Sequence, residues 1–265
     1  GGGRAACRAL RPAAPLLPRR GMAAGARKRD EWKDPEFARA WDQRNVLRTN
    51  PDRTRQTRLL VSLLAARVQP GRAIVDLGAG SGLVEEELFR RAPEARVVGV
   101  DSSEAMLQLA RERLGAHGSR YTPLKADLAG FRASSLPEGV QAACVFASQA
   151  LHEVPDNVKR SVFAAVRALL PSDGAFYILD RFTMDGAQFE PDYACLWAAM
   201  NAEADVPEAM SFDEYLNEYL DKDDHTCSLE DCERWLREAG FSVSRLYQHY
   251  NRALISARPT AAAAP

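Results

Sequence analysis

The stretch Ile74-Val75-Asp76-Leu77-Gly78-Ala79-Gly80-Ser81-Gly82 decides the fold of this 265-residue chain. The apolar run from Ala73 to Leu77 is too short for a helix and suits a buried strand of a parallel sheet. The three glycines allow a tight turn and let a ligand approach the main chain without meeting a Cβ atom. Good helix formers follow, and Glu85, Glu86 and Glu87 stand in the first turns, where acids favour the helix dipole. The stretch therefore predicts a strand, a glycine turn and a helix in succession.

The glycine spacing distinguishes between two kinds of adenosine ligand. A dinucleotide site requires G-x-G-x-x-G, but Leu83 occupies the third glycine position here. Asp76, two residues before the first glycine, would repel a pyrophosphate and attract an ammonium group. The string D-L-G-A-G-S-G resembles motif I of the class I methyltransferases, which use S-adenosylmethionine as methyl donor. That resemblance implies a methyltransferase of the Rossmann-like type. The pattern S-L-E-D-C-E-R-W-L-R-E-A-G-F, followed by a predicted hairpin, resembles the small-molecule members of the group.

The second strand, from Arg96 to Val100, ends at Asp101. A carboxylate at this point can accept hydrogen bonds from both ribose hydroxyls of an adenosine ligand. In the family this acid contacts the ribose. The alternative is that Asp101 or Ser102 caps the helix that begins near Glu104, and both roles are compatible.

A third strand, Tyr121 to Lys125, leads to Asp127 and Leu128. The resemblance implies that Asp127 accepts a hydrogen bond from the adenine amino group and that the Leu128 amide contacts the adenine ring. The alternative is that Asp127 is an acid of a surface turn. The donor-binding residues that the resemblance implies are Asp76, Gly78, Ala79, Gly80, Gly82, Asp101, Ser102, Met106, Asp127, Leu128 and Ser148.

Further strands are predicted over 142–147, 175–179, 241–249 and 252–257, with helices over 158–170 and 229–239. Strands that alternate with helices indicate a doubly wound α/β domain with its ligand at the carboxyl ends of the strands. The predicted fold is a Rossmann-like sheet of seven strands that closes with a C-terminal antiparallel hairpin and carries helices on both faces.

We expect three segments: a leader over 1–29, the methyltransferase domain over 30–258, and a disordered tail over 259–265. The leader holds eight of the 35 basic residues and none of the 36 acidic ones, so the rest of the chain is acidic. It resembles an organelle transit peptide, which would imply a mitochondrial or plastid location. The alternative is that translation starts at Met22, with a cytoplasmic product. A nucleic-acid arm is not expected, because the acidic domain would be repelled by phosphates.

Two segments are expected to shape the acceptor side. Helices over 30–68 are predicted to form a lid, in which Trp41 or Arg44 contacts the methionine tail or the acceptor, or Trp41 simply packs against the sheet. A helical insertion over 183–226 carries Trp197 on an aromatic stripe, which suits either core packing or a pocket wall. Arg181, after the fifth strand, could orient a polar acceptor.

Methyl transfer from an activated donor mainly requires alignment of two partners in a dry site, and alignment can supply about 7–11 kcal/mol. A general base is needed only for an acceptor that must lose a proton. His152 follows the fourth strand and titrates near neutrality, so it is the candidate base, with a structural histidine as the alternative.

The remaining composition narrows the class of protein. The five cysteines show no C-x-x-C pair, so we expect reduced thiols in an intracellular protein and no metal. No run of eighteen apolar residues indicates a membrane span. Three rival hypotheses remain: a methyltransferase acting on protein or RNA, an enzyme that transfers another group of the donor, and a non-catalytic partner protein with the same fold. The sequence names neither the acceptor nor the oligomeric state.

Overall fold

The computed structural model describes residues 31–44, 46–184, 186–220 and 224–261, so the predicted leader and most of the predicted tail lie outside the described residues. At its centre is one seven-stranded sheet with the order β3-β2-β1-β4-β5-β7-β6. The strands are β1 (Ala73–Leu77), β2 (Val97–Asp101), β3 (Tyr121–Lys125), β4 (Ala142–Ser148), β5 (Ala175–Arg181), β6 (Phe241–His249) and β7 (Arg252–Pro259). The first five run parallel, whereas β7 is antiparallel to both β5 and β6. The predicted sheet and its closing hairpin are confirmed.

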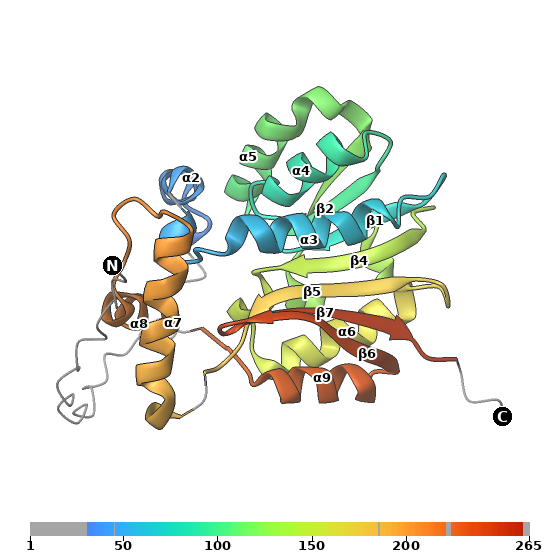
Figure 1. Cartoon of the computed structure of the whole chain (residues 1–265). Helices are drawn as coiled ribbons and strands as arrows, with labels where there is room; N and C mark the ends of the chain where they lie inside the picture. Colours follow the sequence, from blue (N-terminus) through green and yellow to red (C-terminus); the bar gives the residue numbers. More distant parts are fainter. Residues whose placement is uncertain (1–30, 45, 185, 221–223, 262–265) are drawn as a thin grey trace, which may run out of the picture.

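Helices cover both faces of the sheet (Figure 1). One face carries α3 (Arg53–Ala65), α4 (Leu83–Arg91) and α5 (Glu104–Leu114), and the other carries α6 (Asp156–Leu169) and α9 (Leu229–Glu238). Because both faces are covered, β1, β4 and β5 are buried along their whole length and read as continuous apolar runs. β6 is one of the two edge strands, and after the buried Phe241 its positions are exposed or partly buried.

Short 3-10 helices complete the connections: η1 (Val46–Arg48), η2 (Gly115–Arg120), η3 (Leu128–Gly130), η4 (Ala133–Ser135), η5 (Leu151–Glu153) and η6 (Ala187–Phe189). Three further helices, α2 (Pro35–Gln43), α7 (Glu190–Glu203) and α8 (Phe212–Leu220), lie beyond the carboxyl ends of the parallel strands, at the left of Figure 1. The chain leaves β1 and β4 in opposite directions across the sheet. A doubly wound fold forms its ligand crevice at this switch point.

The structure corrects two predicted boundaries. Of the predicted lid segment, α2 lies over the strand ends, whereas α3 packs on the sheet through Leu60, Val61 and Leu64. β7 extends to Pro259, one residue into the predicted tail. Within the described part of the chain, no helix has the length and apolar character needed to cross a bilayer.

Candidate functional site

A cavity of about 640 Å³ lies at the carboxyl ends of the parallel strands and is bounded by the glycine turn, α2 and the start of α3. This volume suits an organic ligand larger than a single metabolite fragment. Ten of the predicted donor-binding residues line it: Asp76, Gly78, Ala79, Gly80, Asp101, Ser102, Met106, Asp127, Leu128 and Ser148. The side chains of Trp41, Arg44, His152 and Arg181 also line it. The switch point therefore gathers residues from five strand ends around one space.

The three glycines of the turn have different roles. A Cβ atom on Gly78 would lie 2.3 Å from the Cβ of Ala150, so this glycine lets two loops pass closely. A Cβ atom on Gly82 would lie 2.8 Å from Leu114 Cδ1, so this glycine permits helix packing and does not face the cavity. A Cβ atom on Gly80 meets nothing within 4 Å, and its backbone lines the cavity at a φ of +54°. Gly80 is therefore the glycine at which a ligand can approach the main chain.

Asp101 joins the second strand to the glycine turn. One of its carboxylate oxygens accepts from the Gly80 amide at 2.8 Å, and the other accepts from the Ser103 amide at 2.8 Å. The helix cap is Ser103, whose hydroxyl accepts from Met106, so the predicted cap at Asp101 or Ser102 is wrong. Burial raises the pKa of Asp101, and the backbone hydrogen bonds oppose that shift. Asp101 thus keeps lone pairs available to the cavity.

Asp127 has the features of both roles predicted for it, ligand contact and a surface turn. It is exposed, it caps η3 by accepting from the Ala129 amide at 2.8 Å, and it lines the cavity. Its position is compatible with both the ligand role and the turn role predicted for it.

A buried pair of carboxyl groups lies behind the turn. Asp76 and Glu85 are 2% and 0% exposed, and in the described chain Asp76 Oδ1 and both Glu85 oxygens have no hydrogen-bond donor. The pair can be satisfied by sharing a proton. Burial and the neighbouring Glu85 raise the pKa of Asp76. Glu85 has its predicted place in the first turn of α4, and its buried side chain in addition interacts with Asp76.

His152 forms a buried dyad with Asp180. The Nδ1 atom of His152 lies 2.6 Å from Asp180 Oδ1, and its Nε2 atom lies 3.4 Å from Glu153 Oε1. Asp180 also accepts from the backbone amides of Leu151, His152 and Arg181. Burial alone would raise the pKa of Asp180, but the charge and hydrogen bond of His152 hold it below its usual value. Such a dyad fixes the imidazole with Nδ1 toward the carboxylate and Nε2 toward the cavity.

Residues 74–174 match the model of the family described as "Methyltransferase domain". This chain contains a class I methyltransferase domain. Trans-aconitate 2-methyltransferase of Rhodopseudomonas palustris strain BisB18 is 36% identical over 119 residues, which are 45% of this chain and 42% of that relative. The enzyme of the same name from Acidovorax ebreus strain TPSY is 33% identical over 139 residues, covering 52% of this chain and 48% of its own length. The match thus spans less than half of each of these relatives.

Solved structures agree with the fold of the methyltransferase domain. An O-methyltransferase family protein from Burkholderia thailandensis superposes with a TM-score of 0.59 at 18% identity, over 87% of this chain and 62% of its own. A DhpI-SAM-HEP complex superposes with a TM-score of 0.56 at 19% identity, over 88% of this chain and 96% of its own. At such identities the likeness concerns the fold alone.

In the methyltransferase domain, α2 is fastened to the glycine turn. Asp42 on α2 accepts from Arg113 of α5 at 3.0 and 2.9 Å and from the Ser81 hydroxyl at 2.5 Å. Trp41 lines the cavity and also packs edge-on against Trp32, with Arg44 over its ring. Of the two roles left open for Trp41, its place in the cavity lining is compatible with ligand contact, whereas its packing partners lie on or beside α2 and on α5, and not on the sheet.

The prediction that Trp197 contributes to the acceptor side is wrong. Trp197 is 1% exposed, stacks on Tyr215 at 4.3 Å between ring centroids, and donates to the carbonyl of Met210 at 2.7 Å. It belongs to an apolar cluster between α7 and α8 and does not line the cavity. The alternative of core packing holds for this stripe.

His152, Glu153 and Asp224 place possible metal-ligand atoms within 4.8 Å of one another. Asp224 forms a buried ion pair with Arg181, which competes with any cation there. The predicted absence of a metal stays a prediction.

Proposed function

We propose that the protein transfers a methyl group from S-adenosylmethionine to a small organic molecule. The observation that carries the proposal is that Gly80 and Asp101 are hydrogen-bonded to each other and face the same switch-point cavity. The residues fit the donor. Gly80 leaves open space, Asp101 has lone pairs for ribose hydroxyls, and Asp76 has an oxygen with no donor that suits an ammonium group. When bound, the donor would supply a methyl group already activated by a positive sulfonium.

The chain's own residues would then have three tasks. The glycine turn and α2 hold the reactants against each other and exclude water, which suits an in-line displacement. Where the acceptor must lose a proton, the Nε2 atom of His152 accepts it. Asp180 stabilises the resulting imidazolium through the 2.6 Å contact to Nδ1.

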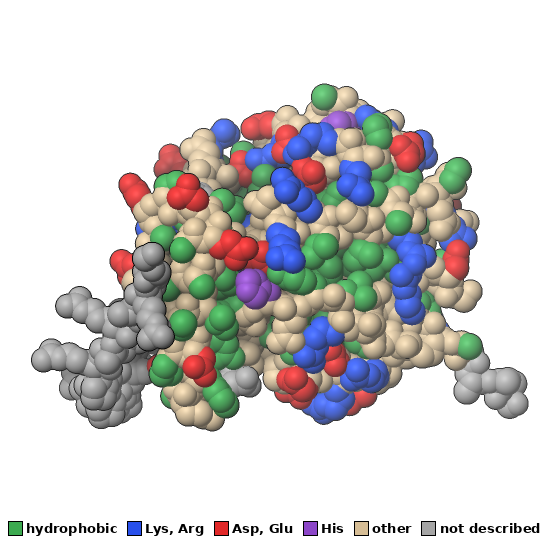
Figure 2. All heavy atoms as spheres, in the orientation of Figure 1, with side chains coloured by type: hydrophobic (Ala, Val, Ile, Leu, Met, Phe, Trp, Pro, Cys, Tyr) green, Lys and Arg blue, Asp and Glu red, His purple; other side chains and the backbone are tan. Residues whose placement is uncertain are grey.

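A small acceptor is favoured over a nucleic acid. The described cavity is lined by α2 and by the start of α3, so the reactants lie inside the domain. Figure 2 shows basic and acidic side chains interspersed on the face it displays, with no continuous basic band there. A nucleic-acid surface would need such a band.

Two measurements test the proposal. Calorimetric titration with S-adenosylhomocysteine should show one binding site per chain. Incubation with deuteromethyl-labelled S-adenosylmethionine and a cell extract should then place the label on a small molecule, detected by mass spectrometry. Label on protein or RNA would replace this proposal by the macromolecular one. Failure of S-adenosylhomocysteine to bind would remove the proposal altogether.

A further inference from the structure

Four guanidinium groups line the cavity, from Arg44, Arg53, Arg181 and Arg252. Arg181 is balanced by its ion pair with Asp224, and Arg44 lies over the ring of Trp41. Within the described part of the chain, neither Arg53 nor Arg252 forms an ion pair with a carboxylate. Arg53 and Arg252 are therefore guanidinium groups of the cavity that have no carboxylate bound to them among the described residues.

Arg252 is a buried cation with only neutral partners. It is 4% exposed and donates to the Thr49 carbonyl at 3.0 Å, to Asn251 Oδ1 at 3.0 Å and to the Tyr215 hydroxyl at 3.3 Å. Its Nε atom has no partner among the described residues. A buried guanidinium without a carboxylate is costly, because desolvation is not offset by an opposite charge. An anionic ligand would supply that charge.

Arg53 lies in the field of Arg252. It is the first residue of α3 and, among the described residues, its side chain forms no hydrogen bond. The pKa of Arg53 is lowered to about 10. Burial is the largest cause, and the nearby positive charge of Arg252 is the second. Asp180 and Asp76 oppose that shift, but Asp180 is already occupied by His152 and three backbone amides.

Tyr215 lies next to the same charges, because its hydroxyl accepts from Arg252 at 3.3 Å. Burial would raise the pKa of Tyr215, yet the guanidinium groups of Arg252 and Arg181 lower it below the usual tyrosine value. The positive field therefore extends around the inner end of β7.

The donor's own carboxylate does not account for both arginines. The donor-binding residues lie at the ends of β1, β2, β3 and, through Ser148, β4, whereas Arg252 is on β7, directly across from Arg181 of β5. In the sheet order β7 is three strands from β1, roughly 14 Å at the usual strand spacing. One cation is enough to pair with the single carboxylate of the donor. Arg44, which follows α2 and lines the same cavity, can be that cation. Arg53 interacts electrostatically with Asp180, the carboxylate bound to His152, and Arg252 pairs in the sheet with the next residue, Arg181.

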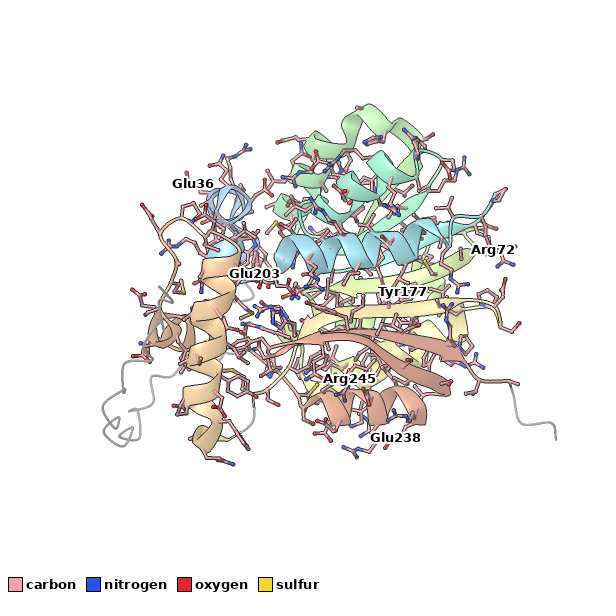
Figure 3. The ribbon with its side chains drawn as sticks, viewed as in Figure 1. Glu36, Arg72, Tyr177, Glu203, Glu238 and Arg245 are labelled. Atoms are coloured by element: carbon pink, nitrogen blue, oxygen red, sulfur yellow. The ribbon has the colours of Figure 1, made fainter. Side chains whose placement is uncertain are left out.

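We propose that the methyl acceptor is a carboxylate anion and that Arg53 and Arg252 bind its carboxylate group. This inference rests on the proposed methyltransferase function. The planar fork of Arg53 matches two carboxylate oxygens, and the Nε–H of Arg252 supplies a third donor. Arginines at the opposite end of the sheet do not offer such a site. There Arg72, which is labelled in Figure 3, forms an ion pair with Asp173 at 3.2 Å.

The test uses the full chain saturated with S-adenosylhomocysteine. Benzoate, succinate and trans-aconitate are titrated in turn, because trans-aconitate is the acid named for the curated relatives. The neutral trimethyl ester of trans-aconitate and ethylphosphonate serve as comparison probes. The variants are Arg53→Gln, Arg53→Lys and Arg58→Gln. Arg58 lies exposed on the same helix and loses the same charge, so it controls for net charge.

At least one carboxylate should bind the wild-type complex and the Arg58→Gln complex alike. Arg53→Gln should weaken it about tenfold or more, which corresponds to about 1.4 kcal/mol. The carboxylate affinity of Arg53→Lys should lie between those of the wild type and Arg53→Gln. In both Arg53 variants the affinity for S-adenosylhomocysteine should change less than about threefold. The neutral ester should not bind.

Several results would overturn the inference while leaving the proposed function intact. These are no carboxylate binding up to about 10 mM, equal binding of acid and ester, or binding of the phosphonate alone. A large loss of S-adenosylhomocysteine affinity in Arg53→Gln would also overturn it, because Arg53 would then hold the donor. Failure of S-adenosylhomocysteine to bind the wild type would instead remove the proposed function.

Discussion

His152 of η5 lies 2.6 Å from Asp180 of β5, measured from Nδ1 to Oδ1, at the edge of the cavity. In the chain, helix α6 separates the two residues. The contact orients the imidazole so that Nε2 lies on the opposite side of the ring, 3.4 Å from Glu153 Oε1. Because Asp180 also binds three backbone amides, the carboxylate is held rigidly and fixes the ring in turn.

We predict that His152→Asn lowers kcat for a hydroxyl or amine acceptor by about 10²- to 10⁴-fold, since the proton acceptor is removed. The affinity for S-adenosylhomocysteine should stay the same, as measured by calorimetry. Asp180→Asn is the companion variant, and it should also lower the free energy of unfolding because its carboxylate is buried. Full activity in His152→Asn would show that the methylated atom carries no proton at the assay pH.

The pair of Asp76 and Glu85 makes donor affinity depend on pH. An ammonium group prefers ionised Asp76, but burial and Glu85 raise the pKa of that carboxyl. Donor affinity should therefore fall as the pH drops through the raised pKa of Asp76, and Glu85→Gln should move this fall to lower pH. Titrations with S-adenosylhomocysteine across about pH 5 to 9 measure both curves. Superimposable curves would exclude an effect of Glu85 on Asp76.

The same pair sets the sign of a stability effect in the ligand-free protein. A carboxyl with a raised native pKa binds its proton more tightly in the folded state. It therefore favours folding below the native pKa, and this contribution is lost as the pH rises through that value. Glu85→Gln removes one of two buried like charges. It should raise Tm at about pH 8 by a few degrees, as expected for about 1 kcal/mol. An unchanged or lower Tm, seen by scanning calorimetry, would contradict this.

Gly80 and Gly78 provide a matched comparison within the turn. Gly80→Val should reduce S-adenosylhomocysteine affinity at least about 100-fold, because the added side chain enters the ligand space. The free energy of unfolding should fall by only about 1–2 kcal/mol, because valine has to adopt the left-handed φ of Gly80. Gly78→Ala should instead impair folding, since its Cβ would meet Ala150 at 2.3 Å. Retained ligand affinity in Gly80→Val would place the donor elsewhere.

The contact between Asp42 and Arg113 should control donor release. Asp42→Asn weakens the attachment of α2 to the glycine turn, because a charge-assisted pair becomes a neutral one. Dissociation of S-adenosylhomocysteine, followed by stopped flow, should become several-fold faster while the association rate changes little. Glu36→Gln, on the same helix and labelled in Figure 3, is the control and should leave both rates unchanged.

The sequence did not reveal the side-chain environments of Glu85 and Trp197, and the physical cause is the same for both. The sequence places Glu85 in the first helical turn, where an acid favours the helix dipole, but it does not show which way the side chain points. Only the rotation of α4 on the sheet turns it inward against Asp76. Trp197 has a helical spacing that fits a core stripe and a pocket wall equally, and the packing of α7 on α8 decides between them.

The sequence by itself determined the strand, the glycine turn and the acids that end the first two strands. Those features depend on contiguous residues, whose φ preferences and apolar periodicity are local properties. Tertiary structure alone decided which distant charges meet. Arg53 opens α3 and Arg252 opens β7, and they come together only because β7 returns antiparallel beside β5 and brings its first residue to the cavity. Coulomb interactions depend on distance in space, which residue spacing along the chain does not reveal.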